Sequence, residues 1–117
     1  SPWMFDEDVV TDSPVRKIAE EVTREKAFIL LHEEIPYSLK VETETWKEMD
    51  DGSVKIYQAI FVNKDAHKII VLGKGGAKIK EIGMRARKDI ARILDQKVHL
   101  YLHVKVREDW MEKDLGF

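Results

Sequence analysis

The sequence predicts a single α+β domain in which a three-stranded sheet packs against three helices, in the order α-β-β-α-α-β. Some stretches repeat apolar residues every three or four positions, as amphipathic helices do. Others alternate apolar and polar residues, as half-buried strands do. With 117 residues, of which 44% are hydrophobic, the chain has the size of one domain with a modest core. It contains no cysteine, which excludes disulfides and thiolate metal sites and suits a reducing compartment.

The first predicted helix begins after Ser13, because serine suits the N-cap and Pro14 then occupies the first helical position. We expect it to continue to about Leu31, since Pro36 disfavours helix in the residue before it. The residues expected to face the core are the apolar ones at helical spacing: Val15, Ile18, Val22 and Ile29, with Ala19 and Phe28 beside them.

Two alternating segments, 37–45 and 54–62, are predicted to form a hairpin around Asp50-Asp51-Gly52-Ser53. In the first strand the expected core side holds the odd-numbered residues, including Thr43 and Thr45. A third strand is expected over 98–106. The residues between the second and third strands predict a short helix over about 66–72 and a longer one over about 77–94. The longer helix should bury Ile79, Ile82, Gly83, Ala86, Ile90 and Ile93.

The junction between these two helices, Gly73-Lys74-Gly75-Gly76, is the most informative part of the chain. Glycines allow backbone conformations closed to other residues and let a ligand approach closely. The amides that follow open a helix, and helix N-termini attract anions. Lys74, Lys78 and Lys80 add positive charge. The segment therefore predicts a clamp for a phosphate backbone.

Neither common nucleotide-binding motif fits this junction. A mononucleotide P-loop places Ser or Thr after Gly-Lys to hold magnesium, whereas Gly76 is followed by Ala77 and Lys78. The dinucleotide fingerprint requires a third glycine where Lys78 stands. The spacing instead fits the Gly-x-x-Gly loop of KH domains, which clamps about four nucleotides of single-stranded nucleic acid. A tight helical corner without a ligand is the alternative interpretation.

Charge along the chain is unevenly distributed. The net charge is −2, yet residues 64–105 contain 11 Lys and Arg against 4 Asp and Glu, whereas residues 1–63 contain 7 against 14. A local positive field of this kind can hold a polyanion although the total is negative. A solvated helix face is the plainer interpretation of the same residues.

Segments on either side of the loop carry a family resemblance. Arg24-Glu25-Lys26-Ala27-Phe28, Glu34-Ile35-Pro36-Tyr37-Ser38 and the glycine loop together resemble the C-terminal KH domain of the Era family, bacterial GTPases of ribosome assembly. The order of elements is that of a type II KH domain. Asp8-Val9-Val10-Thr11-Asp12 resembles the family's interdomain segment, so the resemblance covers essentially the whole chain. Gly75 stands where family members often have lysine.

The resemblance implies a type II KH domain over residues 13–106, with residues 1–12 as the linker from a missing N-terminal GTPase domain. Residues 107–117 would be a C-terminal tail with a short helical turn. The domain would bind the 3′ end of 16S ribosomal RNA during assembly of the 30S subunit. GTP and magnesium would belong to the missing domain. Family members are cytoplasmic, with some peripheral association with the inner membrane, and we expect a monomer.

We expect single-stranded RNA to lie in a groove beside the glycine loop. Backbone amides of Lys74, Gly75 and Gly76 would contact phosphates, and Lys74, Lys78 and Lys80 would supply charge. The predicted binding residues are, in full, Gly73, Lys74, Gly75, Gly76, Lys78 and Lys80 around the loop, Ile70, Val71 and Ile79 as an apolar floor for bases, and Phe61 and Val62 as the opposite wall.

No arrangement of nucleophile and base, and no paired carboxylates with a pocket, points to catalysis, so we expect neither a catalytic residue nor a metal site in these residues. Three alternatives to the leading hypothesis stay open. One is a KH module of another ribosomal protein or transcription factor. Another is a KH scaffold that binds protein rather than RNA. The last is an enzyme whose glycine loop binds a nucleotide, which the missing Gly-Lys-Ser/Thr opposes.

Overall fold

The computed structural model describes residues 13–35 and 39–107, so the expectations for residues 1–12 and for the helical turn in the tail lie outside the described residues. The predicted order α-β-β-α-α-β is confirmed. The elements are α1 (Pro14–Leu31), β1 (Lys40–Glu48), β2 (Val54–Val62), α2 (Asp65–Leu72), the 3₁₀ turn η3 (Lys74–Gly76), α3 (Ala77–Leu94) and β3 (Val98–Val106).

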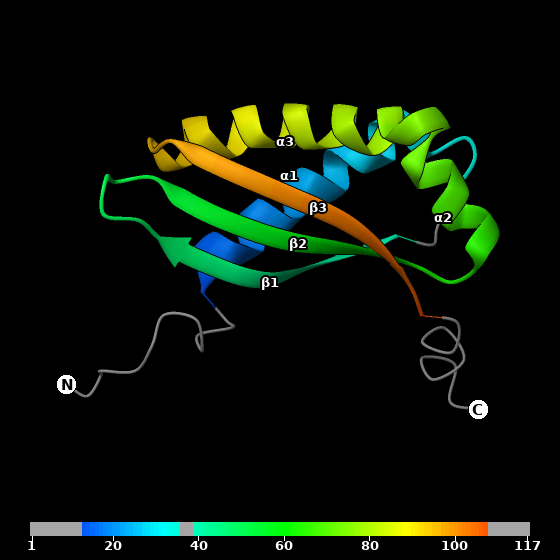
Figure 1. The fold of residues 1–117 in the computed structure, drawn as a ribbon, viewed down its shortest axis with the longest axis horizontal. Helices are drawn as coiled ribbons and strands as arrows, with labels where there is room; N and C mark the ends of the chain where they lie inside the picture. The colour runs from blue at the N-terminus through cyan, green and yellow to red at the C-terminus, as the bar shows by residue number, and fades with distance from the viewer. Residues whose placement is uncertain (1–12, 36–38, 108–117) are drawn as a thin grey trace.

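The three strands form one mixed sheet in the order β1-β2-β3 (Figure 1). The hairpin strands β1 and β2 run antiparallel, whereas β2 and β3 run parallel from the pair Val54–Val98 to the pair Val62–Val106. A parallel partner needs a crossover connection, and here α2, η3 and α3 supply it. Strand β3 is consequently an edge of the sheet and lies beside α3.

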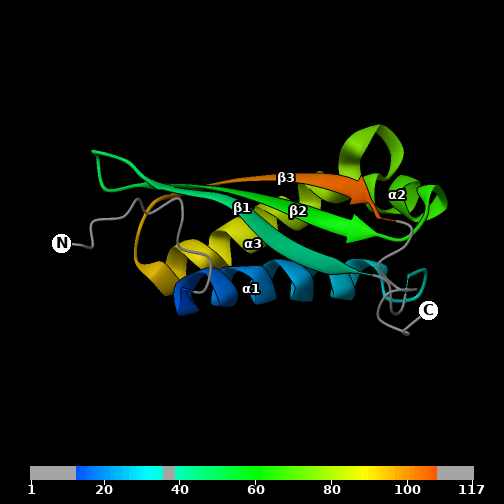
Figure 2. The ribbon, with the colours of Figure 1, turned by 90° about the horizontal axis from the view of Figure 1, so that it is seen from below.

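Two helices cover one face of the sheet, as Figure 2 shows: α1 and α3 lie side by side beneath it. Helix α2 does not share this layer. It lies at the end of the sheet where β2 and β3 finish, and contacts both strands there. Three helices pack against the sheet, as expected, but only α1 and α3 cover its face, and α2 lies across one end. None of the described helices is long and apolar enough to span a membrane.

The central strand β2 forms most of the core. Its side chains Val54, Ile56, Ile60 and Val62 are fully buried beneath the helices, as their alternation predicts. Around them lie two clusters, one near α2 that includes Leu31 and Ile82, and one near the hairpin that includes Trp46, Ala86, Ile90 and Val98. Of the predicted stripe in α3, Ile82, Ala86 and Ile90 are buried, Ile79 and Gly83 are partly buried, and Ile93 is about half exposed.

The predicted core face of α1 is mostly wrong, because only Ala19 is buried and only Val22 packs partly against the core. Val15, Ile18, Phe28 and Ile29 are 37–49% exposed, and the residues that face the core are Arg16, Ala19, Thr23, Ala27 and Leu31. Small side chains allow a helix backbone to approach its neighbours closely. The Thr23 hydroxyl also donates a 2.6 Å hydrogen bond to the Gln58 side chain of β2. A buried amide left without a partner would cost about 1–3 kcal/mol, so this bond fixes which face of α1 turns inward.

A bulge in β1 overturns the expected alternation at its second half. The register with β2 shifts between Thr43 and Thr45, so one extra residue is inserted and the following side chains change sides. As a result Trp46, not Thr45, lies on the helix side of the sheet, where it is only 6% exposed. The aromatic ring thereby fills the core near the hairpin.

Candidate nucleic-acid interface

The glycine loop is built from three residues in left-handed backbone conformations. Gly73, Gly75 and Gly76 have φ values of 74°, 63° and 79°, a region that side chains with a Cβ rarely adopt. Gly73 ends α2, with its amide donating to the Ile69 carbonyl, and the chain then makes the single turn η3 before α3 begins. The sequence alone predicted this turn correctly, because glycine is the residue that most readily adopts a positive φ.

The three glycines differ in what surrounds them. A Cβ on Gly73 would lie 2.6 Å from the Cβ of Lys78 and 2.8 Å from its backbone nitrogen, so this position is closed by packing. A Cβ on Gly75 or Gly76 would meet nothing within 4 Å. The outer side of the loop is therefore open, and a ligand can approach the backbone there.

The loop amides are not equally available. The Gly76 N–H donates to the Gly73 carbonyl at 3.1 Å, and the Ala77 N–H donates to the Lys74 carbonyl. The amides of Lys74 and Gly75 open the turn, where backbone N–H groups have no partner within the helix. Helix α3 also begins at Gly76 without a side-chain cap. The expectation of three phosphate-binding amides is thus corrected for Gly76, whose amide already holds the loop together.

A groove lies between α3 and β3, and its lining begins at Ile79 in the first turn of α3, close after the loop. Its volume is about 450 Å³, and it is lined by Ile79, Lys80, Gly83, Met84 and Arg87 of α3 and by Leu100, Tyr101 and Leu102 of β3. Gly83 permits the two elements to lie close, since a Cβ there would stand 3.5 Å from a methyl group of Leu102. The walls are mainly apolar, with Lys80 and Arg87 as cations.

This geometry corrects the predicted second wall of the groove. The wall is β3, not the end of β2. Val62 is fully buried in the core, and Phe61 is only 5% exposed because the Arg107 guanidinium lies 3.7 Å from its ring centre. Neither side chain can contact a bound strand. The sequence showed that both strands exist but not which one lies next to α3.

The predicted apolar floor is only partly formed. Val71 is fully buried, so its side chain belongs to the core. Ile70 is half-buried and packs against the same core cluster. Ile79 packs against that cluster as well, but it also lines the groove. Of the three residues proposed as a floor, Ile79 is therefore the one that lines the groove, and Leu100 and Leu102 complete the apolar surface.

The three lysines that were predicted to bind RNA lie in different places. Lys80 lines the groove, whereas Lys78 lines another hollow with His32, Glu33 and Glu34 at the end of α1. Lys74 is exposed on the loop. Arg87 and Met84 were missed in the sequence, although their spacing from Lys80 along α3 and their place beside Gly83 could have indicated them.

Ion pairs distinguish the groove from the rest of α3. On its other sides Asp89 contacts Lys26 at 2.7 Å and Arg92 at 3.2 Å, and Glu81 contacts Arg85 at 2.7 Å. The Lys26 ammonium, by its hydrogen bond, holds the pKa of Asp89 below its ordinary value. Within the described part of the chain, Lys74, Lys78, Lys80 and Arg87 form no ion pair. Their positive charge is left for an anion.

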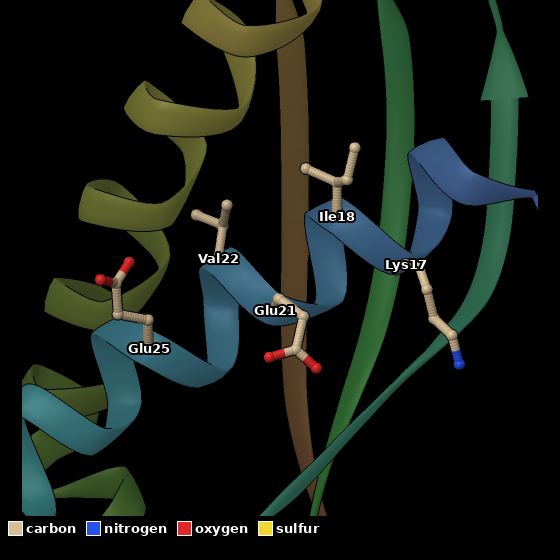
Figure 3. A pocket seen from close by; sticks show the side chains of 5 residues that line it. All are labelled: Lys17, Ile18, Glu21, Val22 and Glu25. Atoms are coloured by element: carbon tan, nitrogen blue, oxygen red, sulfur yellow. The ribbon is translucent and has the colours of Figure 1, made fainter.

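A second hollow lies on α1, with a volume of about 580 Å³. Figure 3 shows Ile18, Val22 and Glu25 on one side of the helix and Lys17 and Glu21 directed elsewhere. All of the described lining residues belong to this one helix, and two carboxylates accompany a single cation. Such a surface would repel a polyanion, so the groove beside the glycine loop is the better candidate site.

Comparison with known proteins agrees with this assignment. A family model described as the KH domain matches residues 34–111. The chain is 56% identical over 109 residues to GTPase Era of Sinorhizobium medicae, and 57% identical over 109 residues to that of Afipia carboxidovorans. In both cases the match covers 93% of this chain and 35% of the relative. The chain thus spans about a third of the length of the curated relatives that it matches.

Solved structures give the same result. A crystal structure of an Aquifex aeolicus Era variant bound to GDP·AlF4⁻ has a TM-score of 0.79 and 42% identity, covering 92% of this chain and 36% of that one. A crystal structure of Era in complex with MgGDPNP and nucleotides 1506–1542 of 16S ribosomal RNA has a TM-score of 0.78 at the same identity and coverage. With the family model matching more than half of its residues, and with the type II order of elements in its fold, this chain belongs to the KH domain family.

Proposed function

We propose that this chain binds single-stranded RNA, with the phosphate backbone on the glycine loop and bases in the groove between α3 and β3. The observation that carries the proposal is the open outer side of Gly75 and Gly76 next to cations without ion-pair partners, at the mouth of a mainly apolar groove. Backbone amides and unpaired lysines suit phosphates, and an apolar groove suits unstacked bases.

The loop, the apolar side chains of the groove and the backbone of β3 would each make a different kind of contact with RNA. The amides of Lys74 and Gly75, with the Lys74 ammonium, hold phosphates at the groove entrance. Ile79, Leu100 and Leu102 offer flat apolar contact to bases. Strand β3 is an edge strand, and an edge presents backbone N–H and C=O groups that are not used by a neighbouring strand. These groups can read the hydrogen-bonding edges of bases.

The relatives suggest which RNA is bound. One similar structure contains Era with a segment of 16S ribosomal RNA, and we extend to this chain a preference for the 3′ end of that RNA and a role in assembly of the 30S subunit. GTP hydrolysis, with its GTP and magnesium, would belong to a GTPase domain beyond these residues. We propose a cytoplasmic, monomeric domain, with peripheral association with the inner membrane as a property of the longer protein.

The test is a charge reversal in the loop, Lys74→Asp with Gly75→Asp. We expect the affinity for an unpaired oligonucleotide of about eight nucleotides, matching the 3′ end of 16S ribosomal RNA, to fall about 100-fold or more, because phosphate contacts dominate such affinity. The unmodified chain should bind less tightly as salt rises from about 50 to about 200 mM. Fluorescence anisotropy measures both, and a titration with GTP should give no signal.

The chain offers a matched control, Lys17→Asp with Gly52→Asp. Gly52 also has a positive φ, 88°, and an open surrounding. It belongs to the turn between β1 and β2, which lies at the end of the molecule opposite α2 (Figure 1), and Lys17 belongs to the first turn of α1. The control makes the same chemical changes and the same change in net charge, so it should bind RNA with nearly the original affinity. Equal loss in both variants would show that net charge alone matters and would contradict the proposed site.

A further inference from the structure

An aromatic pair lies on the face of the sheet that the helices leave open. Tyr57 of β2 and Tyr101 of β3 are partners in the parallel register, and their rings stack with centroids 4.7 Å apart at an interplanar angle of 19°. Both remain substantially exposed, at 39% and 44%. The rings cover each other's inner faces, and an unpaired base can extend the stack by lying on an outer face.

The neighbours of the pair differ on its two sides. Toward α2, the charges on this face are mostly satisfied: Glu44 contacts His103 at 2.9 Å and Lys105 at 2.6 Å, and Arg107 covers Phe61. Toward the hairpin the next row holds Lys47, Lys55 and His99. In the described residues neither lysine of this row forms an ion pair. The two lysines line a hollow together with the carboxylates of Glu48, Asp50 and Asp51. The charge beside the pair is thus mixed, and the aromatic rings themselves are the feature that fits an unpaired base.

The pair is continuous with the groove. Tyr101 lines the groove together with Arg87, Leu100 and Leu102, whereas Tyr57 is not among the residues lining it and lies one strand further in. A strand of RNA that leaves the groove across the edge strand β3 therefore meets Tyr101 first and Tyr57 next. A protein partner would also find exposed tyrosines here, but the shared border with the groove favours RNA.

We propose that the Tyr57–Tyr101 stack is a second contact site for single-stranded RNA, which takes a base of a nucleotide flanking those held in the groove. This inference rests on the proposed function, because it assigns a path to RNA already bound at the glycine loop. It predicts that RNA longer than the roughly four nucleotides clamped by a KH loop gains affinity from the open face of the sheet.

The decisive variant is Tyr57→Ala, measured with two RNAs, one of about four nucleotides and one extended to roughly ten. The short RNA should bind Tyr57→Ala as it binds the original chain. The extended RNA should bind about 10-fold more weakly, as expected for the loss of one base–aromatic stack. Tyr57→Phe, which keeps a ring of the same shape, should restore the affinity, and Ile93→Ala, at another exposed apolar residue, should leave both affinities unchanged.

A second readout is direct. With tyrosine rings labelled for NMR, the extended RNA should shift the ring signals of Tyr57 and the short RNA should not. If the original chain binds neither RNA, the proposed function itself fails and this inference falls with it. If the original chain binds both and Tyr57→Ala has equal effects on the two lengths, or none, RNA binds only in the groove and the inference is overturned. The same holds if the extended RNA binds no more tightly than the short one.

Discussion

Helices α1 and α3 each have 18 residues and cover the same face of the sheet, yet they do so by different means. Helix α3 buries Ile82, Ala86 and Ile90, the residues that its apolar periodicity selects. Helix α1 turns small and polar residues inward and leaves Ile18, Phe28 and Ile29 nearly half exposed. Apolar periodicity thus locates the core only where the helix packs through large side chains. Where it packs closely, size and hydrogen bonding decide.

The two helices also begin differently. Helix α1 is capped by the Ser13 hydroxyl, which accepts a hydrogen bond from the Val15 N–H at 3.2 Å. Helix α3 begins at Gly76 without such a bond. A side-chain cap stabilises a helix by about 1 kcal/mol. Helix α3 lacks such a cap at the position where the proposed ligand binds. The capped end belongs to the scaffold, and the uncapped end is part of the proposed site.

The largest expected effect is a contrast between two Ile→Ala substitutions. Ile90→Ala in α3 removes a side chain that is 1% exposed and should lower the free energy of unfolding by about 3 kcal/mol. Ile18→Ala in α1 removes one that is 44% exposed and should lower it by only about 0.5 kcal/mol. Urea denaturation measures both. A loss at Ile18 as large as that at Ile90 would mean that α1 packs through its apolar face.

The next effect concerns the start of α3. Gly73→Ala forces a left-handed residue against Lys78, where the new Cβ would stand 2.6 Å from the existing one, and should destabilise the domain by about 3 kcal/mol. Gly75→Ala meets nothing within 4 Å and should cost about 1 kcal/mol, for the backbone conformation alone. Thermal unfolding distinguishes them, and similar costs at both positions would show that the packing of Gly73 against Lys78 is unimportant.

The smallest effect concerns the ion pair that joins the two helices. Hydrogen bonding to Lys26 lowers the pKa of Asp89 in the folded chain, so the pair stabilises the fold above the ordinary pKa of aspartate, about 3.9. This stabilisation is lost as the pH falls through that value and below it. Asp89→Asn should make the midpoint of urea unfolding less dependent on pH between about pH 5.5 and pH 3. A dependence identical to that of the original chain would show that the pair contributes nothing.

Local signals in the sequence were enough to predict much of this domain. The even-numbered core residues of β2, the centre of the α3 stripe and the glycine loop each depend on residues close together in the chain, and these were predicted correctly. The odd-numbered Ala59 and Phe61 of β2 are buried as well, so the alternation does not hold along the whole strand. The identities of Lys74 and Gly75 as the exposed tip of the loop follow from the same local pattern.

What could not be predicted depends on residues far apart. The inward face of α1 is set by Thr23 bonding to Gln58, which lies 35 residues away. The bulge at Glu44 changes the sides of the residues after it without any glycine or proline to announce it. The wall opposite α3 is β3 because β3 pairs in parallel with β2, and periodicity does not encode strand order. This is why Phe61 was wrongly included as a groove residue.

The parallel pairing of β3 also has a consequence for biosynthesis. Val54 of the central strand β2 pairs with Val98 of β3, and β3 is synthesised after α2 and α3. A nascent chain that has emerged only as far as α3 already holds the glycine loop, but it has no surface against which bases can lie. The proposed RNA binding in this groove therefore requires the completed final strand.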